Sequence, residues 1–133
     1  MSTTQAQNWM STPFSIERKR GKAPGTVILS LTGPFTARDM CAALTPIELR
    51  NAFDPSPVAG EDPAALNILD LTAVPYMDSC GLGIIVTHYT RSQNRGQKMI
   101  AAGASPRVME LMRPTKIDTI IPLEATVEAA ELG

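Results

Sequence analysis

Residues 66–83 read LNILDLTAVPYMDSCGLG and contain the clearest structural signals in this chain of 133 residues. The first six, Leu66–Leu71, are mostly apolar and predict a buried strand. After a short connection, the Asp–Ser pair that includes Ser79 predicts a helix start, because such side chains cap helices. We expect Ser79 to be the cap. A strand that passes into a helix through a short loop is typical of parallel α/β sheets.

Upstream of this stretch, the sequence predicts a β-hairpin followed by an interrupted helix. Phe14–Arg18 alternates between apolar and polar residues, and Thr26–Leu31 is apolar and β-branched, so we expect two paired strands. Thr36 is placed to cap a helix. Thr45–Glu48 combines a capping box with proline at the first helical position, which predicts a kink or a restart there. The second helical piece is expected to end around Phe53.

Downstream, strands and helices continue to alternate. Gln97–Ala102 predicts a strand, and Ser105–Pro106 a helix start with proline at its first position. Ile117–Leu123 is expected to be a last strand at a sheet edge, because Pro122 cannot donate a backbone hydrogen bond. Thr126–Leu132 predicts a closing helix. The order β-β-α-β-α-β-α-β-α predicts an α/β fold, a mixed and mostly parallel sheet of four to five strands with about four helices.

Length and composition suggest a single domain over residues 13–133, preceded by a polar tail at residues 1–12. Residues 54–65 contain three prolines and three acids, which predicts an acidic surface loop. Twelve basic and thirteen acidic residues leave a net charge of −1, which argues against nucleic acid as a partner. No apolar stretch reaches the ~20 residues that membrane insertion requires. The two cysteines need no disulfide, so a reducing cytoplasm is the expected location.

The sequence around Ser79 does not match common catalytic motifs. A serine-hydrolase elbow requires glycine where Met77 stands, and a dinucleotide-binding loop requires a third glycine where Val86 stands. The Walker phosphate-binding motif is absent. The one histidine, His88, lies in the same predicted helix and is expected at its surface, and the cysteines have no metal-ligand spacing. We therefore predict no catalytic residue, no cofactor and no metal.

The predicted helix start has two interpretations on physical grounds alone. Free N–H groups and the positive end of the helix dipole would stabilise a phosphoserine at Ser79 by ~0.3–1 kcal/mol. Gly81 and Gly83 weaken the first turn by up to ~1 kcal/mol each, which suggests that another chain approaches the backbone closely there. The alternative is an ordinary capped turn between a strand and a helix. An apolar stripe of Leu82, Ile85, Val86 and Tyr89 is expected to face the core.

The same residues resemble a known family. Asn67–Thr72 followed by Tyr76–Gly83 is similar to the signature of the STAS domain, which is named after sulfate transporters and anti-sigma factor antagonists. The free-standing bacterial antagonists carry Met-Asp-Ser-Ser/Thr-Gly-Leu-Gly at the corresponding helix start. Leu31–Gly33 and Ser105–Pro106 also match, and the resemblance extends from about Phe14 to Leu132. It implies a STAS fold.

The resemblance also implies a function. In the family, an anti-sigma factor that is also a serine kinase phosphorylates the serine after the motif aspartate, and a PP2C-type phosphatase removes the phosphate. The unphosphorylated antagonist captures the anti-sigma factor and frees the sigma factor. Here the phosphoacceptor would be Ser79, and ATP and Mg²⁺ would belong to the kinase. The implied partner-binding residues are Thr36, Met77, Asp78, Ser79, Cys80, Gly81, Leu82 and Gly83.

The chain departs from the family pattern at two places. Cys80 stands where serine or threonine is usual, and Gly33–Thr36 reads Gly-Pro-Phe-Thr where antagonists often have Gly-Glu-hydrophobic-Asp. Pro34, Thr36 and the acidic loop at Asp54–Asp62 favour an alternative, a STAS adaptor subunit of a signalling scaffold or an ABC transporter. A third alternative is a small enzyme or ligand-binding protein that uses the carboxyl ends of the parallel strands.

Overall fold

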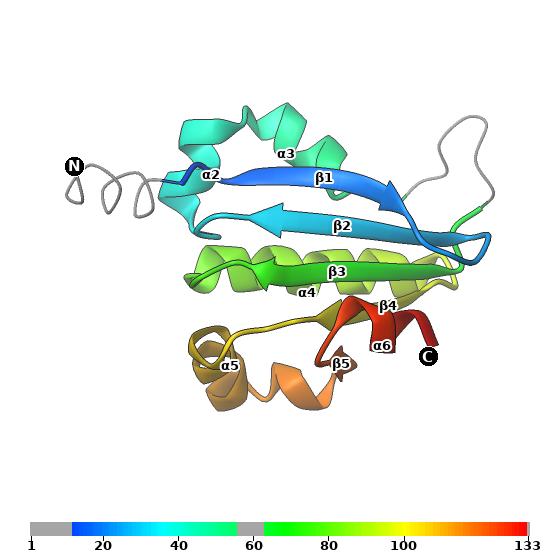
Figure 1. Ribbon diagram of the computed structural model, residues 1–133. Helices are drawn as coiled ribbons and strands as arrows, with labels where there is room; N and C mark the ends of the chain where they lie inside the picture. Colours follow the sequence, from blue (N-terminus) through cyan, green and yellow to red (C-terminus); the bar gives the residue numbers. More distant parts are fainter. Residues whose placement is uncertain (1–11, 56–62, 133) are drawn as a thin grey trace, which may run out of the picture.

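The computed structural model describes residues 12–55 and 63–132 (Figure 1). The predicted tail at residues 1–12 therefore lies outside the described residues except for Thr12. The acidic loop predicted at residues 54–65 is described only at its two ends.

A five-stranded sheet forms the centre of the fold. Its strands are β1 (Ser15–Arg20), β2 (Thr26–Thr32), β3 (Leu66–Ala73), β4 (Lys98–Ala102) and β5 (Leu123–Glu124). The strands lie side by side in sequence order; β1 is antiparallel to β2, and every other neighbouring pair is parallel. The predicted hairpin and the mixed, mostly parallel sheet are thus confirmed.

Helices cover both faces of the sheet (Figure 1). They are α2 (Ala37–Ala43), α3 (Pro46–Ala52), α4 (Ser79–Asn94), α5 (Pro106–Met112) and α6 (Val127–Leu132). Alternate residues of a strand point to opposite faces, so β2, β3 and β4 each supply two cores. The larger core lies between the sheet and the side that carries α4, and the smaller one lies under α6.

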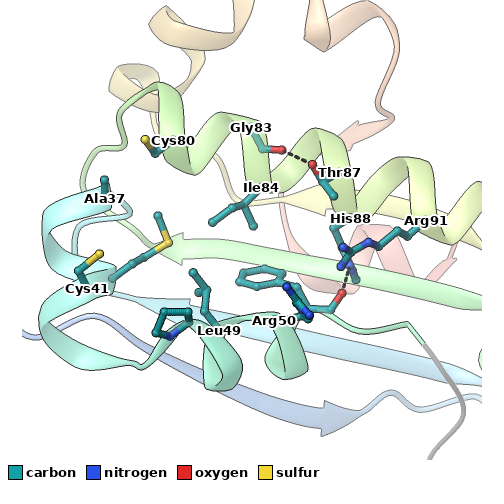
Figure 2. Close-up of a pocket in the computed structure, with 13 residues that line it drawn as sticks. Ala37, Cys41, Leu49, Arg50, Cys80, Gly83, Ile84, Thr87, His88 and Arg91 are labelled. Atoms are coloured by element: carbon teal, nitrogen blue, oxygen red, sulfur yellow. Dashed lines mark hydrogen bonds between the residues drawn. The ribbon is translucent and has the colours of Figure 1, made fainter.

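The predicted interruption between α2 and α3 is confirmed. The Thr45 hydroxyl accepts a hydrogen bond from the Glu48 backbone N–H, and the Glu48 carboxylate accepts one from the Thr45 N–H. Pro46 lies in the first helical turn, where backbone N–H groups have no partner within the helix. Its missing N–H therefore costs no helical hydrogen bond. The chain therefore turns between two short helices that pack beside α4 (Figure 2).

The prediction of a strand at Ile117–Leu123 is wrong over most of its length. Residues Arg113–Thr115 and Ile117–Thr119 form two short 3₁₀ turns, and only Leu123 of the predicted strand pairs, in β5. The Thr119 hydroxyl donates to the Lys116 carbonyl at 2.6 Å, so a local bond competes with strand pairing. Pro122 contributes only its carbonyl, which accepts a hydrogen bond from the Ala101 N–H.

The apolar stripe predicted on α4 is partly wrong. Leu82 and Ile85 are buried as expected, but Val86 is 36% exposed. His88, expected at the surface, is buried and only 3% exposed. The buried face is centred on Ile85 and is rotated toward His88, because the end of α3 packs against that side of α4.

Candidate functional site

The site predicted around Ser79 is built from two loops that leave neighbouring strands. Beyond the ends of β2 and β3, the Gly33 N–H donates to the Ala73 carbonyl and the Phe35 N–H to the Tyr76 carbonyl, both at 3.0 Å. The Asp78 N–H donates to the Phe35 carbonyl at 3.3 Å. The two loops therefore run side by side, and this places the start of α2 next to the start of α4.

Asp78 joins the two helix starts with a single carboxylate. Its Oδ1 accepts hydrogen bonds from the backbone N–H groups of Cys80 and Gly81, both at 3.0 Å. Its Oδ2 accepts from the Ala37 N–H of α2 at 3.1 Å. The cap of α4 is thus Asp78, and the prediction that Ser79 caps the helix is wrong. A carboxylate at this position satisfies free N–H groups and complements the dipoles of both helices.

Thr36 lies at the same junction and caps α2. Its hydroxyl accepts a hydrogen bond from the Asp39 N–H at 3.1 Å and donates to the Asp39 carboxylate. The residue is partly buried. Thr36 therefore positions the start of α2, and the Ala37–Asp78 bond links it to the turn that carries Ser79.

Three of the predicted site residues form the outer side of the first α4 turn: Ser79, Cys80 and Gly83 are all exposed. Ser79 is the first helical residue, and its hydroxyl has no hydrogen-bond partner within residues 12–55 and 63–132. A Cβ added to Gly83 would have no heavy atom within 4 Å. This side of the helix is open to a partner.

The other predicted residues lie beneath that surface. Met77 is 9% and Leu82 is 6% exposed, and both belong to the larger core. A Cβ on Gly81 would overlap the Phe35 carbonyl oxygen and would lie 3.1 Å from the Phe35 ring. The close approach that was expected from a second chain is therefore made at Gly81 by the chain's own Phe35. Gly81, Leu82 and Met77 support the site rather than form its surface.

A groove begins beside Cys80 and runs between α2–α3 and α4 (Figure 2). We call it the interhelix groove; its volume is about 540 Å³. Its walls include Met40, Cys41 and Leu49 from one side and Cys80, Ile84 and Thr87 from the other. The motif did not indicate this groove, because half of its wall comes from α2 and α3.

His88 lies at the far end of the groove from the two cysteines (Figure 2). Its Nδ1 donates to the Phe53 carbonyl at 3.0 Å, since a carbonyl can only accept. The two rings meet edge to face, 5.7 Å apart. Burial lowers the pKa of His88, and the positive charge of Arg91 adds to this, whereas the Phe53 hydrogen bond and the Asp54 charge act in the opposite direction. His88 is therefore a neutral structural group near pH 7.

Within residues 12–55 and 63–132, no group of three or more His, Cys, Asp or Glu side chains is placed to hold a metal ion. No helix in the described part of the chain has the length and hydrophobicity needed to cross a membrane.

Comparison with known proteins is consistent with this architecture. The profile of the STAS domain matches residues 18–130. The chain therefore belongs to the STAS domain family.

Two curated relatives have a local match to the chain. Both are named anti-sigma-B factor antagonist, one from Listeria monocytogenes and one from Listeria innocua, and each is 36% identical over 56 residues. The match covers 42% of this chain and 49% of each relative, so the chain spans about half the length of the curated relatives it matches.

Solved structures share the fold at low sequence identity. A putative anti-sigma factor antagonist from Thermotoga maritima has a TM-score of 0.68 and 18% identity, covering 93% of this chain and 95% of that one. A sulfate transporter family protein from Wolinella succinogenes has a TM-score of 0.64 and 16% identity, covering 86% and 91%. At such identities, the likeness establishes the fold and not the function.

Proposed function

We propose that this chain is an anti-sigma factor antagonist whose binding is switched off by phosphorylation of Ser79. The observation that carries the proposal is the position of Ser79: its hydroxyl is exposed and unengaged, directly after the aspartate that anchors α4. The names of the Listeria relatives support the same function.

The partner is an anti-sigma factor with serine-kinase activity, and a PP2C-type phosphatase restores the unphosphorylated form. The surface offered to the anti-sigma factor consists of Ser79, Cys80 and Gly83, with Asp78 and Thr36 at its edge. Met77, Gly81 and Leu82 hold this surface from beneath. The chain itself performs no catalysis in this scheme, because ATP and Mg²⁺ are bound by the kinase. The single domain of residues 13–133 would act in the cytoplasm.

Phosphorylation can switch binding without refolding the domain. A phosphate on Ser79 adds about 1.5–2 negative charges at pH 7. The Ser79 hydroxyl makes no hydrogen bond among the described residues, and the helix N-terminus tolerates an anion, so the fold is expected to persist. The dianion would nevertheless stand beside the Asp78 carboxylate and would have to lose water in the complex. Losing about 3 kcal/mol in this way weakens binding by roughly a hundredfold.

A second candidate function is favoured by the Gly33–Thr36 loop. The family pattern places an acid where this chain has Thr36, and the Thr36 hydroxyl is engaged with the Asp39 carboxylate. This difference supports an adaptor subunit of a signalling scaffold or an ABC transporter, which would bind its partner without control of a sigma factor.

The test is a pull-down from lysate of the native organism, using the wild type, Ser79→Ala and Ser79→Asp, with bound proteins identified by mass spectrometry. Ser15→Asp is the matched control, because it places the same charge on an exposed serine of β1. We expect the wild type, Ser79→Ala and Ser15→Asp to retain a kinase-like anti-sigma factor that Ser79→Asp loses. Retention of the same transporter or scaffold subunits by all four would replace the proposal with the adaptor function.

Phosphorylation itself is tested with the purified kinase recovered in that experiment. Incubation with ATP and Mg²⁺ should add one phosphate to the wild type, and peptide mapping should place it on Ser79. An equally modified Ser79→Ala variant would show that the phosphoacceptor lies elsewhere.

A further inference from the structure

The interhelix groove has a chemical character that binding of an anti-sigma factor at Ser79 does not explain. Its walls are largely apolar: Met40 and Leu49 face Ile84 across it, and Phe53 contributes an aromatic ring. Its volume of about 540 Å³ lies within the ~300–1,000 Å³ typical of small-ligand sites. An apolar groove of this size favours an apolar ligand.

The two ends of the groove differ in charge. Arg50 of α3 and Arg91 of α4 lie at the end that contains His88, and Cys41 and Cys80 lie at the opposite end (Figure 2). Neither guanidinium has an ion pair or a hydrogen bond within the described ranges 12–55 and 63–132. No carboxylate lies among the described lining residues, although the Asp54 carboxylate is close enough to act on His88. Two exposed arginines at the same end of the groove, neither of them paired with a carboxylate among the described residues, favour one anionic group.

The polar groups in the groove favour an acyl chain over an extended peptide. The Thr87 hydroxyl already donates to the Gly83 carbonyl at 2.9 Å, and the His88 Nδ1 is bonded to the Phe53 carbonyl. The walls are helices, whose backbone groups away from the helix ends are paired within each helix. An extended peptide would bring unpaired N–H and C=O groups against these walls, which is costly, whereas an acyl chain has none.

We propose that the interhelix groove binds a monomeric amphipathic carboxylate, a fatty acid or a similar acyl anion. Its carboxylate lies between Arg50 and Arg91, and its chain follows Ile84 and Leu49 toward Met40. Such a ligand would connect acyl metabolism to the helix whose first turn carries Ser79. The inference does not depend on the proposed sigma-factor function, because it concerns binding by the chain alone.

The test uses the full ¹⁵N-labelled chain, titrated with dodecanoate below its micelle concentration and followed by two-dimensional NMR. We expect the largest amide shifts at Cys41, Gly83 and Thr87, with little change in β1 or α6. Affinity should rise about fourfold for each methylene from decanoate to dodecanoate, because each added CH₂ enters the groove. Dodecyltrimethylammonium, which has the same chain and the opposite charge, should bind at least tenfold more weakly.

Two pairs of variants locate the ligand. Arg50→Gln together with Arg91→Gln should weaken dodecanoate binding ten- to a hundredfold, because charge-assisted bonds are lost. Arg38→Gln is the control, an exposed arginine on α2 that does not line the groove. Gly83→Phe should block binding by filling open space, whereas Thr90→Phe, on the same helix outside the groove, should not.

Several results would overturn the proposal. These are the absence of amide shifts at millimolar dodecanoate, shifts centred away from the groove, and equal binding of the cationic and anionic chains. Unchanged affinity in the double arginine variant, with the fold intact by circular dichroism, would also refute it. Groove shifts with an acidic helical peptide but not with dodecanoate would show that the groove is a protein-binding surface instead.

Discussion

The inner and outer sides of the first turn of α4 differ in what they contact, although residues of the two sides alternate within a few positions of the sequence. On the inner side, Asp78 caps the helix and contacts α2, while Gly81 admits the Phe35 carbonyl. On the outer side, the Ser79 hydroxyl has no hydrogen-bond partner among the described residues, and a Cβ added to Gly83 would have no heavy atom within 4 Å.

This difference separates two glycines that the motif presents as equivalent. Gly81 is required by the fold, since any side chain there would overlap Phe35. Gly83 is not required by the fold, since a side chain would project into open space. A glycine that weakens a helix without a packing reason supports the proposal that a partner approaches the backbone at Gly83.

The largest effect is expected from Gly81→Ala. The added methyl group would force apart α4 and the Phe35 backbone, and overpacking of this kind destabilises a protein by about 2–3 kcal/mol. Urea unfolding should show a lower midpoint with an unchanged slope. A variant as stable as the wild type would show that the loop at Phe35 moves at little cost in free energy. Gly81 on the inner side and Gly83 on the outer side would then not differ in their importance for the fold.

The second-largest loss of stability is expected at Asp78, where two variants distinguish the cap of α4 from the contact with α2. Asp78→Ala should lower the free energy of unfolding by about 1–2 kcal/mol, because the cap of α4 and the contact with Ala37 are both lost. Asp78→Asn keeps one carbonyl oxygen for the α4 cap but cannot accept at both positions, so it should lose less. Equal losses in the two variants, measured by urea unfolding, would show that the contact with α2 is the dominant one.

A smaller effect follows from His88, which lies on the inner side of α4. Its pKa is lowered in the folded state, so the unfolded chain binds the proton more tightly. Stability should therefore fall as the pH drops below the unfolded pKa of ~6.5, by at most about 1.4 kcal/mol per pH unit. His88 is the one histidine in the sequence, so His88→Gln should remove the dependence between pH 6.5 and 5. An identical pH profile in the variant would contradict the burial of a neutral ring.

The smallest effect on folding is expected from Gly83→Ala, the matched control for Gly81→Ala. It should stabilise the helix by up to about 0.5–1 kcal/mol, since alanine is the better helix former. The same variant should bind the anti-sigma factor more weakly in the pull-down, because the methyl group covers the outer side. Stabilisation with unchanged binding would remove Gly83 from the partner-binding surface.

The sequence predicted most of the elements that depend on local signals. The strands at β2 and β3 and the helix starts at Thr36 and Thr45 lie where hydrophobic pattern and capping residues placed them. Ile117–Leu123 was misassigned because an apolar, β-branched run resembles a strand. Nothing in the run reveals that the Thr119 hydroxyl bonds to the nearby Lys116 carbonyl.

The buried polar groups could not be predicted for a similar reason. Asn67 donates to the Gln97 side chain at 2.7 Å and to the Ser92 hydroxyl at 3.2 Å. Gln97 in turn donates to the Pro55 carbonyl at 3.2 Å. These residues are far apart in the sequence, and a polar residue by itself predicts an exposed position. They can be buried only because folding brings their hydrogen-bond partners together.

The sequence by itself determined the order of strands and helices, the family and the position of Ser79 at a helix start. The order of elements and the helix start depend on periodicity and capping, which act over a few neighbouring residues. The family rests instead on the resemblance of Asn67–Thr72 and Tyr76–Gly83 to the STAS signature. The tertiary structure alone decided that Asp78 rather than Ser79 is the cap, that Gly81 faces inward and Gly83 outward, and that Arg50 and Arg91 share a groove. Those outcomes depend on Phe35, α2 and α3, which lie about 30 to 45 residues away in the chain and come into contact only when β2 and β3 pair.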